Sequence, residues 1–98
     1  MYRGSTPKHS FTTKTDISNA VVAYVTYKQN NEVIVEKSLS DITFEEGSYY
    51  VTLTQDETLS FTERDATVQT RARLADGSAW VSNICTFKVL PINKEGVI

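Results

Sequence analysis

Apolar and polar residues alternate in short segments along most of this chain, and turn-forming residues separate one segment from the next. Successive side chains of a strand point to opposite faces, so a period of two predicts β-strands with one buried face. Several such strands at short spacing are typical of a sandwich or a barrel. The expected strands are Ser10–Thr13, Ala20–Lys28, Glu32–Ser38, a short one around Ile42 and Phe44, Ser48–Thr54, Ala66–Ala75 and Ala79–Leu90.

The residues between these segments indicate how the strands connect. The asparagines of Gln29–Asn31 tolerate the positive φ of a tight hairpin turn, and Asp76-Gly77 is the strongest turn dipeptide in the chain. Pro7 suits a sheet edge, where a missing N–H does no harm. About seven short strands paired as hairpins must close two faces on one core. We therefore expect one all-β domain over residues 1–98, a two-sheet antiparallel sandwich of immunoglobulin type.

The alternation stops inside the stretch VTLTQDETLSF. Thr54 and Glu57 have the spacing of a capping box, in which the Thr side chain caps a helix and the Glu side chain accepts a hydrogen bond from the Thr amide. This spacing predicts one short helical turn near residues 55–60, of the kind that carries a chain from one sheet to the other. Such a turn would bring Leu59 and Phe61 back over the core.

Few residues qualify as catalytic groups. Asp56 and Glu57 form a pair of carboxylates, but neighbouring side chains point in different directions and no third group completes a site. His9, the only histidine, lies near an edge segment and is expected to be solvated. Cys85, the only cysteine, lies on an apolar strand face and is expected to be buried. We expect neither a His9–Cys85 pair, nor any other catalytic site, nor a cofactor.

Composition narrows the classes of partner. Ten basic and twelve acidic residues give a net charge of −2, which argues against nucleic-acid binding because no basic excess is present to neutralise phosphates. The longest apolar run, Ala20–Val25, is far shorter than the roughly 20 residues of a membrane span, and the N-terminus has no apolar signal region. A single cysteine excludes an internal disulfide and fits folding in a reducing cytoplasm.

Acidic residues are the only candidate metal ligands. Their carboxylates could supply oxygens to calcium, although no run resembles an EF-hand loop and a solvated edge explains them equally well. These residues are Asp41, Glu45, Glu46, Asp56, Glu57, Glu63 and Asp65.

Aromatic residues on the face opposite the core are the strongest sign of a binding surface. Tyr24, Tyr50 and Trp80 are expected there, with Ile84 beside Trp80. Exposed aromatic and apolar side chains mark contact with a protein partner. Flat rings also stack on sugars, so a host cell-surface glycan is the alternative ligand, and packing of this face against a loop remains equally compatible with the pattern.

Two further features bear on partners. Arg71 and Arg73 share one side of their strand and are expected to pair with cross-strand carboxylates such as those near Glu36. The terminal segments, residues 1–9 and 92–98, are expected either to order on a partner or to fray in solution.

Three segments in the same order carry a family resemblance: YRGSTPKHSF, VTLTQDETLSF and VQTRARLADGSAWVSNI. Together they resemble short immunoglobulin-like β-sandwich proteins encoded among the tail and baseplate genes of prophages in Gram-positive bacteria. The likeness spans nearly the full chain, while residues 14–47 match in pattern only. It implies a non-enzymatic virion component, made in the host bacterial cytoplasm, that contacts other phage structural proteins or further copies of itself. The resemblance transfers no catalytic residues.

Overall fold

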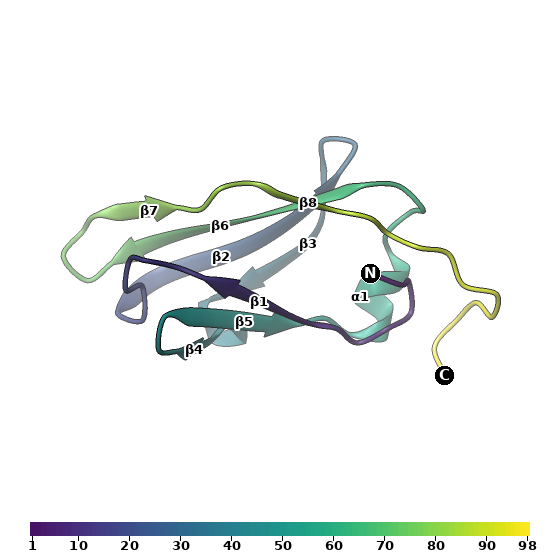
Figure 1. Cartoon of the computed structure of the whole chain (residues 1–98), viewed down its shortest axis with the longest axis horizontal. Coiled ribbons are helices and arrows are strands. Elements are labelled where there is room, and N and C mark those ends of the chain that lie inside the picture. Colours follow the sequence, from purple (N-terminus) through teal and green to yellow (C-terminus); the bar gives the residue numbers. More distant parts are fainter.

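Two antiparallel sheets pack face to face in the computed structural model, which describes all 98 residues (Figure 1). The smaller sheet has the order β1-β5-β4, with β1 at Lys8–Thr12, β4 at Thr43–Glu45 and β5 at Ser48–Thr52. The larger sheet has the order β3-β2-β6-β7, with β8 also paired to β6. Its strands are β2 (Ala20–Gln29), β3 (Glu32–Ser38), β6 (Ala66–Leu74), β7 (Ala79–Val81) and β8 (Cys85–Phe87). Two short helices complete the fold, η1 at Leu39–Asp41 and α1 at Gln55–Leu59.

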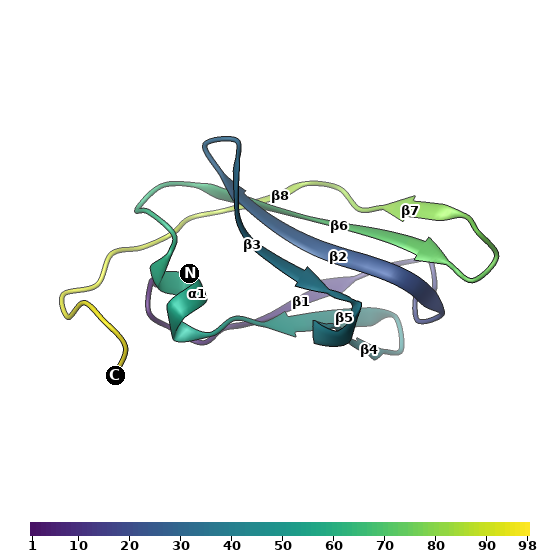
Figure 2. The ribbon, with the colours of Figure 1, turned by 180° about the vertical axis from the view of Figure 1, so that it is seen from behind.

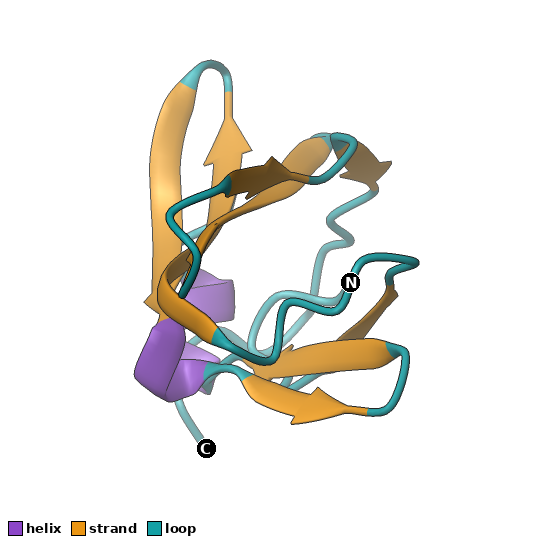
Figure 3. Ribbon diagram, turned by 90° about the vertical axis from the view of Figure 1, so that its left-hand side faces the viewer, coloured by secondary structure: helices purple, strands orange, loops and turns teal.

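The chain crosses between the sheets three times, from β1 to β2, from β3 to β4 and from β5 to β6. Seen along the long axis of the molecule, the strands form two layers (Figure 3). This confirms the expected two-sheet antiparallel sandwich of immunoglobulin type. The observed strand bounds differ from the expected ones by at most two residues, except in the last segment.

The core lies between the two layers and is built from every second residue of the longer strands. Its members come from both sheets, so the period-two pattern of the sequence is the pattern of burial. The fully or nearly buried apolar residues are Ile17, Ala23, Val25, Tyr27, Val35, Ile42, Tyr49, Val51, Leu53, Phe61, Ala66, Val68, Ala72 and Val89.

The segment expected as one strand, Ala79–Leu90, is two strands separated by residues 82–84. Ser82 forms this break: its amide donates to the Thr70 carbonyl and its hydroxyl oxygen accepts from the Thr70 amide. Along β7 Ala72 lies opposite Trp80, whereas along β8 Val68 lies opposite Cys85, so the register shifts by one residue. A one-residue shift exchanges the two faces of a strand.

This shift corrects the expected shared face of Val81, Cys85, Phe87 and Val89. Val81 lies opposite the exposed Arg71 and points to solvent, while Trp80 points inward. Beyond the break, Cys85 and Phe87 occupy inward positions opposite Val68 and Ala66, and Val89 is buried.

The polar break in VTLTQDETLSF is α1, a corner between β5 and β6, as expected. Thr54 caps it: the Glu57 amide donates to Thr54 Oγ1 (3.2 Å), and the Thr54 amide donates to Glu57 Oε1 (2.8 Å). Phe61, only 1% exposed, follows the helix into the core, and Leu59 packs against Gly4. The capping box therefore directs the chain from one sheet to the other.

A buried glutamine fixes the chain after this corner. Gln29, 4% exposed at the end of β2, donates from Nε2 to the carbonyls of Thr62 (2.9 Å) and Arg64 (3.0 Å), and its Oε1 accepts from the Thr62 amide (2.8 Å). The neighbouring hairpin turn has positive φ at Asn30 (49°) and Asn31 (65°), as the sequence predicts.

Both ends of the chain lie beside α1 (Figures 1 and 2). The N-terminal segment meets the segment that follows β8 in an isolated parallel bridge between Tyr2 and Leu90. The Arg3 guanidinium donates to the Phe61 carbonyl (2.8 Å), and the Gln55 side chain exchanges hydrogen bonds with the Ile98 backbone (3.0 and 2.9 Å). Both terminal segments therefore have contacts within the protein's own fold.

Removal of the cap should weaken the corner. Thr54→Ala loses the side-chain acceptor for the Glu57 amide, so we expect the free energy of unfolding to fall by about 1 kcal/mol. The matched control, Thr54→Ser, keeps the acceptor and should stay close to wild type. Urea unfolding followed by circular dichroism measures both values, and equal losses in the two variants would contradict the capping role.

Candidate interaction surface

The outer face of the larger sheet displays apolar side chains in register with arginines. Tyr24 on β2 lies directly across from Arg71 on β6, and Arg71 lies across from Val81 on β7. Tyr24 is 44% exposed and Val81 51% exposed. The next row places Val22 opposite Arg73 and Arg73 opposite Ala79. We call this surface the outer face; its members are Val22, Tyr24, Val33, Arg71, Arg73, Ala79, Val81 and Ile84.

Two shallow hollows mark this face. One, of about 320 Å³, lies among Val22, Tyr24, Arg71 and Arg73. The other, of about 530 Å³, lies on the opposite side of Arg71, which lines both hollows, and includes Ile84, which is 62% exposed. Arg71 is therefore the side chain around which the outer face is arranged.

The two arginines make no ion pair and no side-chain hydrogen bond; the ion pairs of the protein are Arg3–Glu95 and Lys37–Glu57. The expected pairing with carboxylates near Glu36 is wrong, because Glu36 lies across from Thr26, one row away from Arg71. Its carboxylate accepts from the Thr26 hydroxyl (3.2 Å) instead. Both guanidinium groups keep their donors available for an external acceptor, for which carboxylates are the best geometric match.

The four residues expected to form one contact patch lie in three places. Tyr24 and Ile84 belong to the outer face. Tyr50 lies on the far side of the molecule, on β5 of the smaller sheet, with the Lys8 ammonium 3.9 Å from its ring centroid. Trp80 points into the sandwich and meets the Tyr49 ring edge-on, with centroids 6.4 Å apart. The expectation that Trp80 lies opposite the core is wrong, because the break at Ser82 sets the register of β7.

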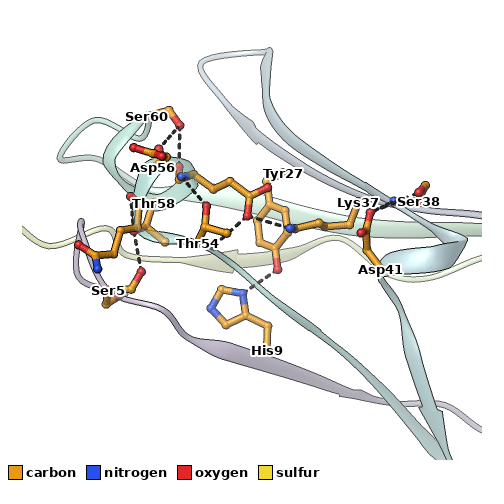
Figure 4. A network of polar contacts seen from close by, with 12 residues as sticks. Ser5, His9, Tyr27, Lys37, Ser38, Asp41, Thr54, Asp56, Thr58 and Ser60 are labelled. Carbon is orange, nitrogen blue, oxygen red and sulfur yellow. Dashed lines mark hydrogen bonds and ion pairs between the residues drawn. The ribbon is translucent and has the colours of Figure 1, made fainter. Parts of the chain in front are cut away.

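His9 is half-buried, so the expectation that its side chain is solvated is wrong; the side chain points toward Tyr27 (Figure 4). Its Nδ1 lies 2.6 Å from the Tyr27 hydroxyl, and its ring packs against those of Tyr27 and Phe87. Burial lowers the pKa of His9, and the N-terminal ammonium lowers it further. Burial raises the pKa of Tyr27, so this phenol stays protonated. The two side chains therefore form a hydrogen bond inside the sandwich, and their rings pack against each other.

The two carboxylates of α1 do not act together. Burial alone would raise the pKa of Glu57, but hydrogen bonds from Lys37 and Thr54, with the charge of Lys37, hold it below its usual value. The Lys37 ammonium lies 2.7 Å from Glu57 Oε1. This carboxylate therefore accepts from the Thr54 amide in the helix cap and forms an ion pair with Lys37 on β3. Asp56 is exposed. The geometry supports the corner and not a catalytic pair.

Cys85 is exposed, which corrects its expected burial. It does face inward, opposite Val68, but no strand of the smaller sheet lies beyond β1 to cover it. Cys85 and His9 line one hollow of about 390 Å³ between β1 and β8, and no hydrogen bond joins them.

The structure contains no group of three or more histidine, cysteine or acidic side chains placed to hold a metal ion. Asp41, one of the candidate calcium ligands, accepts from the Ser38 amide (3.0 Å) at the start of η1. The helices are all too short to cross a membrane.

Comparisons with protein-family models, with curated proteins and with solved structures give no match to this chain.

The burial of His9 predicts a stability that depends on pH. Since the folded pKa lies below the unfolded value of 6.5, the unfolded chain binds the proton more strongly, and stability present above pH 6.5 is lost as the pH falls below it. Glu57 has the same sign but acts in a lower window, below its usual value of 4.5. The free energy of urea unfolding, measured at steps from pH 8 to pH 4, should show both losses.

The variant His9→Gln removes the first of these titrations. We expect its stability to be flat just below pH 6.5, where wild type declines, while the loss below pH 4.5 remains. A wild-type profile that is flat around pH 6 would contradict the effect of burial on His9.

Proposed function

We propose that this chain is a non-enzymatic structural or assembly module of a phage or prophage tail or baseplate, located in the virion, and that it acts by protein–protein contact. The observation that carries the proposal is the outer face, where two unpaired arginines lie in register with exposed apolar side chains. The resemblance of three sequence segments to prophage tail-region proteins supports the phage setting.

Residue types and their arrangement favour a protein partner for this face. Tyr and Arg are enriched in protein interfaces and in the few residues that dominate binding energy. Single exposed apolar residues are normal, but here Tyr24 and Val81 flank Arg71 directly across neighbouring strands. The partner surface that fits is apolar at its centre, with carboxylates placed to meet Arg71 and Arg73.

The rest of the molecule provides a firm support for such a contact. The outer face is carried by β2 and β6, the longest strands, which pair with each other along most of their length. Gln29 and the capped corner fix the connections at one end of these strands. A rigid sheet loses little conformational entropy on binding.

The alternative, a module for host cell-surface glycans, draws no support from the side-chain positions. Its three rings were Tyr24, Tyr50 and Trp80, and they lie on the outer face, on the far sheet and inside the sandwich, respectively. The three rings therefore form no shared aromatic surface, and no observation favours this function over protein contact.

The proposal predicts that contact depends on one face of the sandwich. In particles induced from a lysogen that encodes this chain, the wild-type protein should copurify with tails. Tyr24→Ala and Arg71→Ala should weaken the association about tenfold or more, as expected of interface centres.

Tyr50→Ala is the matched control, because it removes the same side chain from the opposite face and should leave association unchanged. Absence of the wild-type protein from purified particles would contradict the proposal. Equal losses in Tyr24→Ala and Tyr50→Ala would contradict the assignment to the outer face.

A further inference from the structure

Strand β1 has a free edge. It is the outermost strand of the smaller sheet and pairs only with β5. Two bonds that flank it set the hydrogen-bonding phase: the Leu53 amide donates to the Pro7 carbonyl and the Thr13 amide donates to the Gly47 carbonyl, both at 3.1 Å. Paired residues in an antiparallel ladder alternate between bonded and non-bonded. The backbone N–H and C=O groups of Lys8, Ser10 and Thr12 therefore point away from β5.

The other sheet edges are less able to accept a strand. β4 is three residues long and runs into Glu45 and Glu46. β3 pairs with β2 through a bulge and carries Glu32, Glu36 and Lys37, and the edge formed by β7 and β8 is interrupted at residues 82–84. Short length, bulges and charges are the usual protection of edge strands against pairing.

The edge of β1 has little of this protection. Its ladder with β5 is regular over all five residues, and two of the three residues with outward backbone groups are the neutral Ser10 and Thr12. Its one charged residue is Lys8, whose ammonium is turned over the Tyr50 ring of its own sheet.

The core is also open beside this edge. Cys85 occupies an inward position yet is exposed, and Phe11, which points inward from β1, is only half-buried. Both border the hollow of about 390 Å³ between β1 and β8, whose walls include Val68 and Phe87. One further strand beside β1 would cover this apolar opening.

We propose that this strand is β1 of a second copy, paired antiparallel about a two-fold axis at Ser10. In this register Ser10 lies opposite Ser10 of the second copy, and Lys8 lies opposite Thr12 of the second copy. These are the residues with outward N–H and C=O groups, so every free group of the edge meets a partner.

The inner face of the pairing completes the fit. His9 lies opposite Phe11 of the second copy, because these residues alternate with the bonded ones. Phe11 of the second copy then lies beside His9, at the edge of the hollow that Met1 and Phe87 also line. The ladder of each copy ends at β4, so the pairing gives a closed dimer with a continuous sheet and no open polymer.

A second copy fits this edge better in the antiparallel sense than in the parallel one. The antiparallel register sets each lysine against a threonine, whereas parallel pairing would bring Lys8 next to Lys8 of the second copy. The pairing leaves the outer face of the larger sheet free. It therefore does not depend on the proposed tail contact, and either can fail without the other.

Charge at position 12 tests the register. Thr12 is exposed on the outer side of β1, so its substitution leaves the core intact. Thr12→Lys sets one like charge opposite each Lys8, two such pairs per dimer, and should raise the dimer dissociation constant about 2- to 30-fold, and Thr12→Glu should lower it by a similar factor. Sedimentation of the purified full chain over a concentration series up to the millimolar range, at low salt, measures the constants.

A substitution that removes a backbone N–H of β1 tests the role of the strand edge. Ser10→Pro removes an outward N–H that β5 does not use and should abolish dimerisation, while Ser10→Ala keeps this N–H and should dimerise like wild type. The reaction of Cys85 with a thiol reagent gives a second measurement, because it should slow as wild-type protein becomes concentrated and not in Thr12→Lys. Circular dichroism establishes that each variant is folded.

The outcomes are distinct. A wild-type chain that stays monomeric at millimolar concentration overturns the inference, as does a dimer on which Thr12→Lys and Thr12→Glu have the same effect. If Ser10→Pro does not fold, the opposite shifts of the two Thr12 variants decide the matter. None of these outcomes changes the expected effect of Tyr24→Ala on tail association.

Discussion

The capped turn α1 is the interaction on which the rest of the sandwich depends. Glu57 satisfies the Thr54 amide and also binds the Lys37 ammonium, so one carboxylate joins the end of the smaller sheet to β3 of the larger one. The Thr58 hydroxyl donates to the Ser5 carbonyl (2.8 Å) on the opposite side of the helix. With Arg3 held by carbonyls of the same corner, the turn positions both sheets and both ends of the chain. Five helical residues therefore tie together two layers that share no backbone hydrogen-bonded ladder.

Local signals predict much of this fold. Alternation places nearly all strands and the core residues of β2, β5 and β6, because burial alternates along the length of these strands. The Thr54–Glu57 spacing predicts the corner, since a capping box needs only two suitable residues three positions apart. The asparagine turn follows from the positive φ that a tight hairpin demands.

The failures arise where burial depends on a neighbouring strand. Trp80 and Val81 exchange faces because Ser82 binds the Thr70 backbone, a contact between distant segments that alternation does not encode. Cys85 has the inward orientation expected of it but lacks a covering strand, and His9 gains cover from Phe87 of the other sheet. The arginines lack carboxylate partners because register sets Arg71 against Tyr24 and leaves Glu36 in the adjacent row. Orientation within a strand was thus more predictable than the environment that the orientation meets.

The break at residues 82–84 also determines how this surface can diversify. It holds one extra residue outside the ladder with β6, so the side chains on display depend on the bonds between Ser82 and Thr70 as well as on the residues of β7. If that residue entered the ladder, β7 would continue the register of β8, with Val81 opposite Ala72 and Trp80 opposite Arg73. Val81 would then turn inward and the indole of Trp80 outward. The side chains that this surface presents can therefore change without any substitution in the outer face.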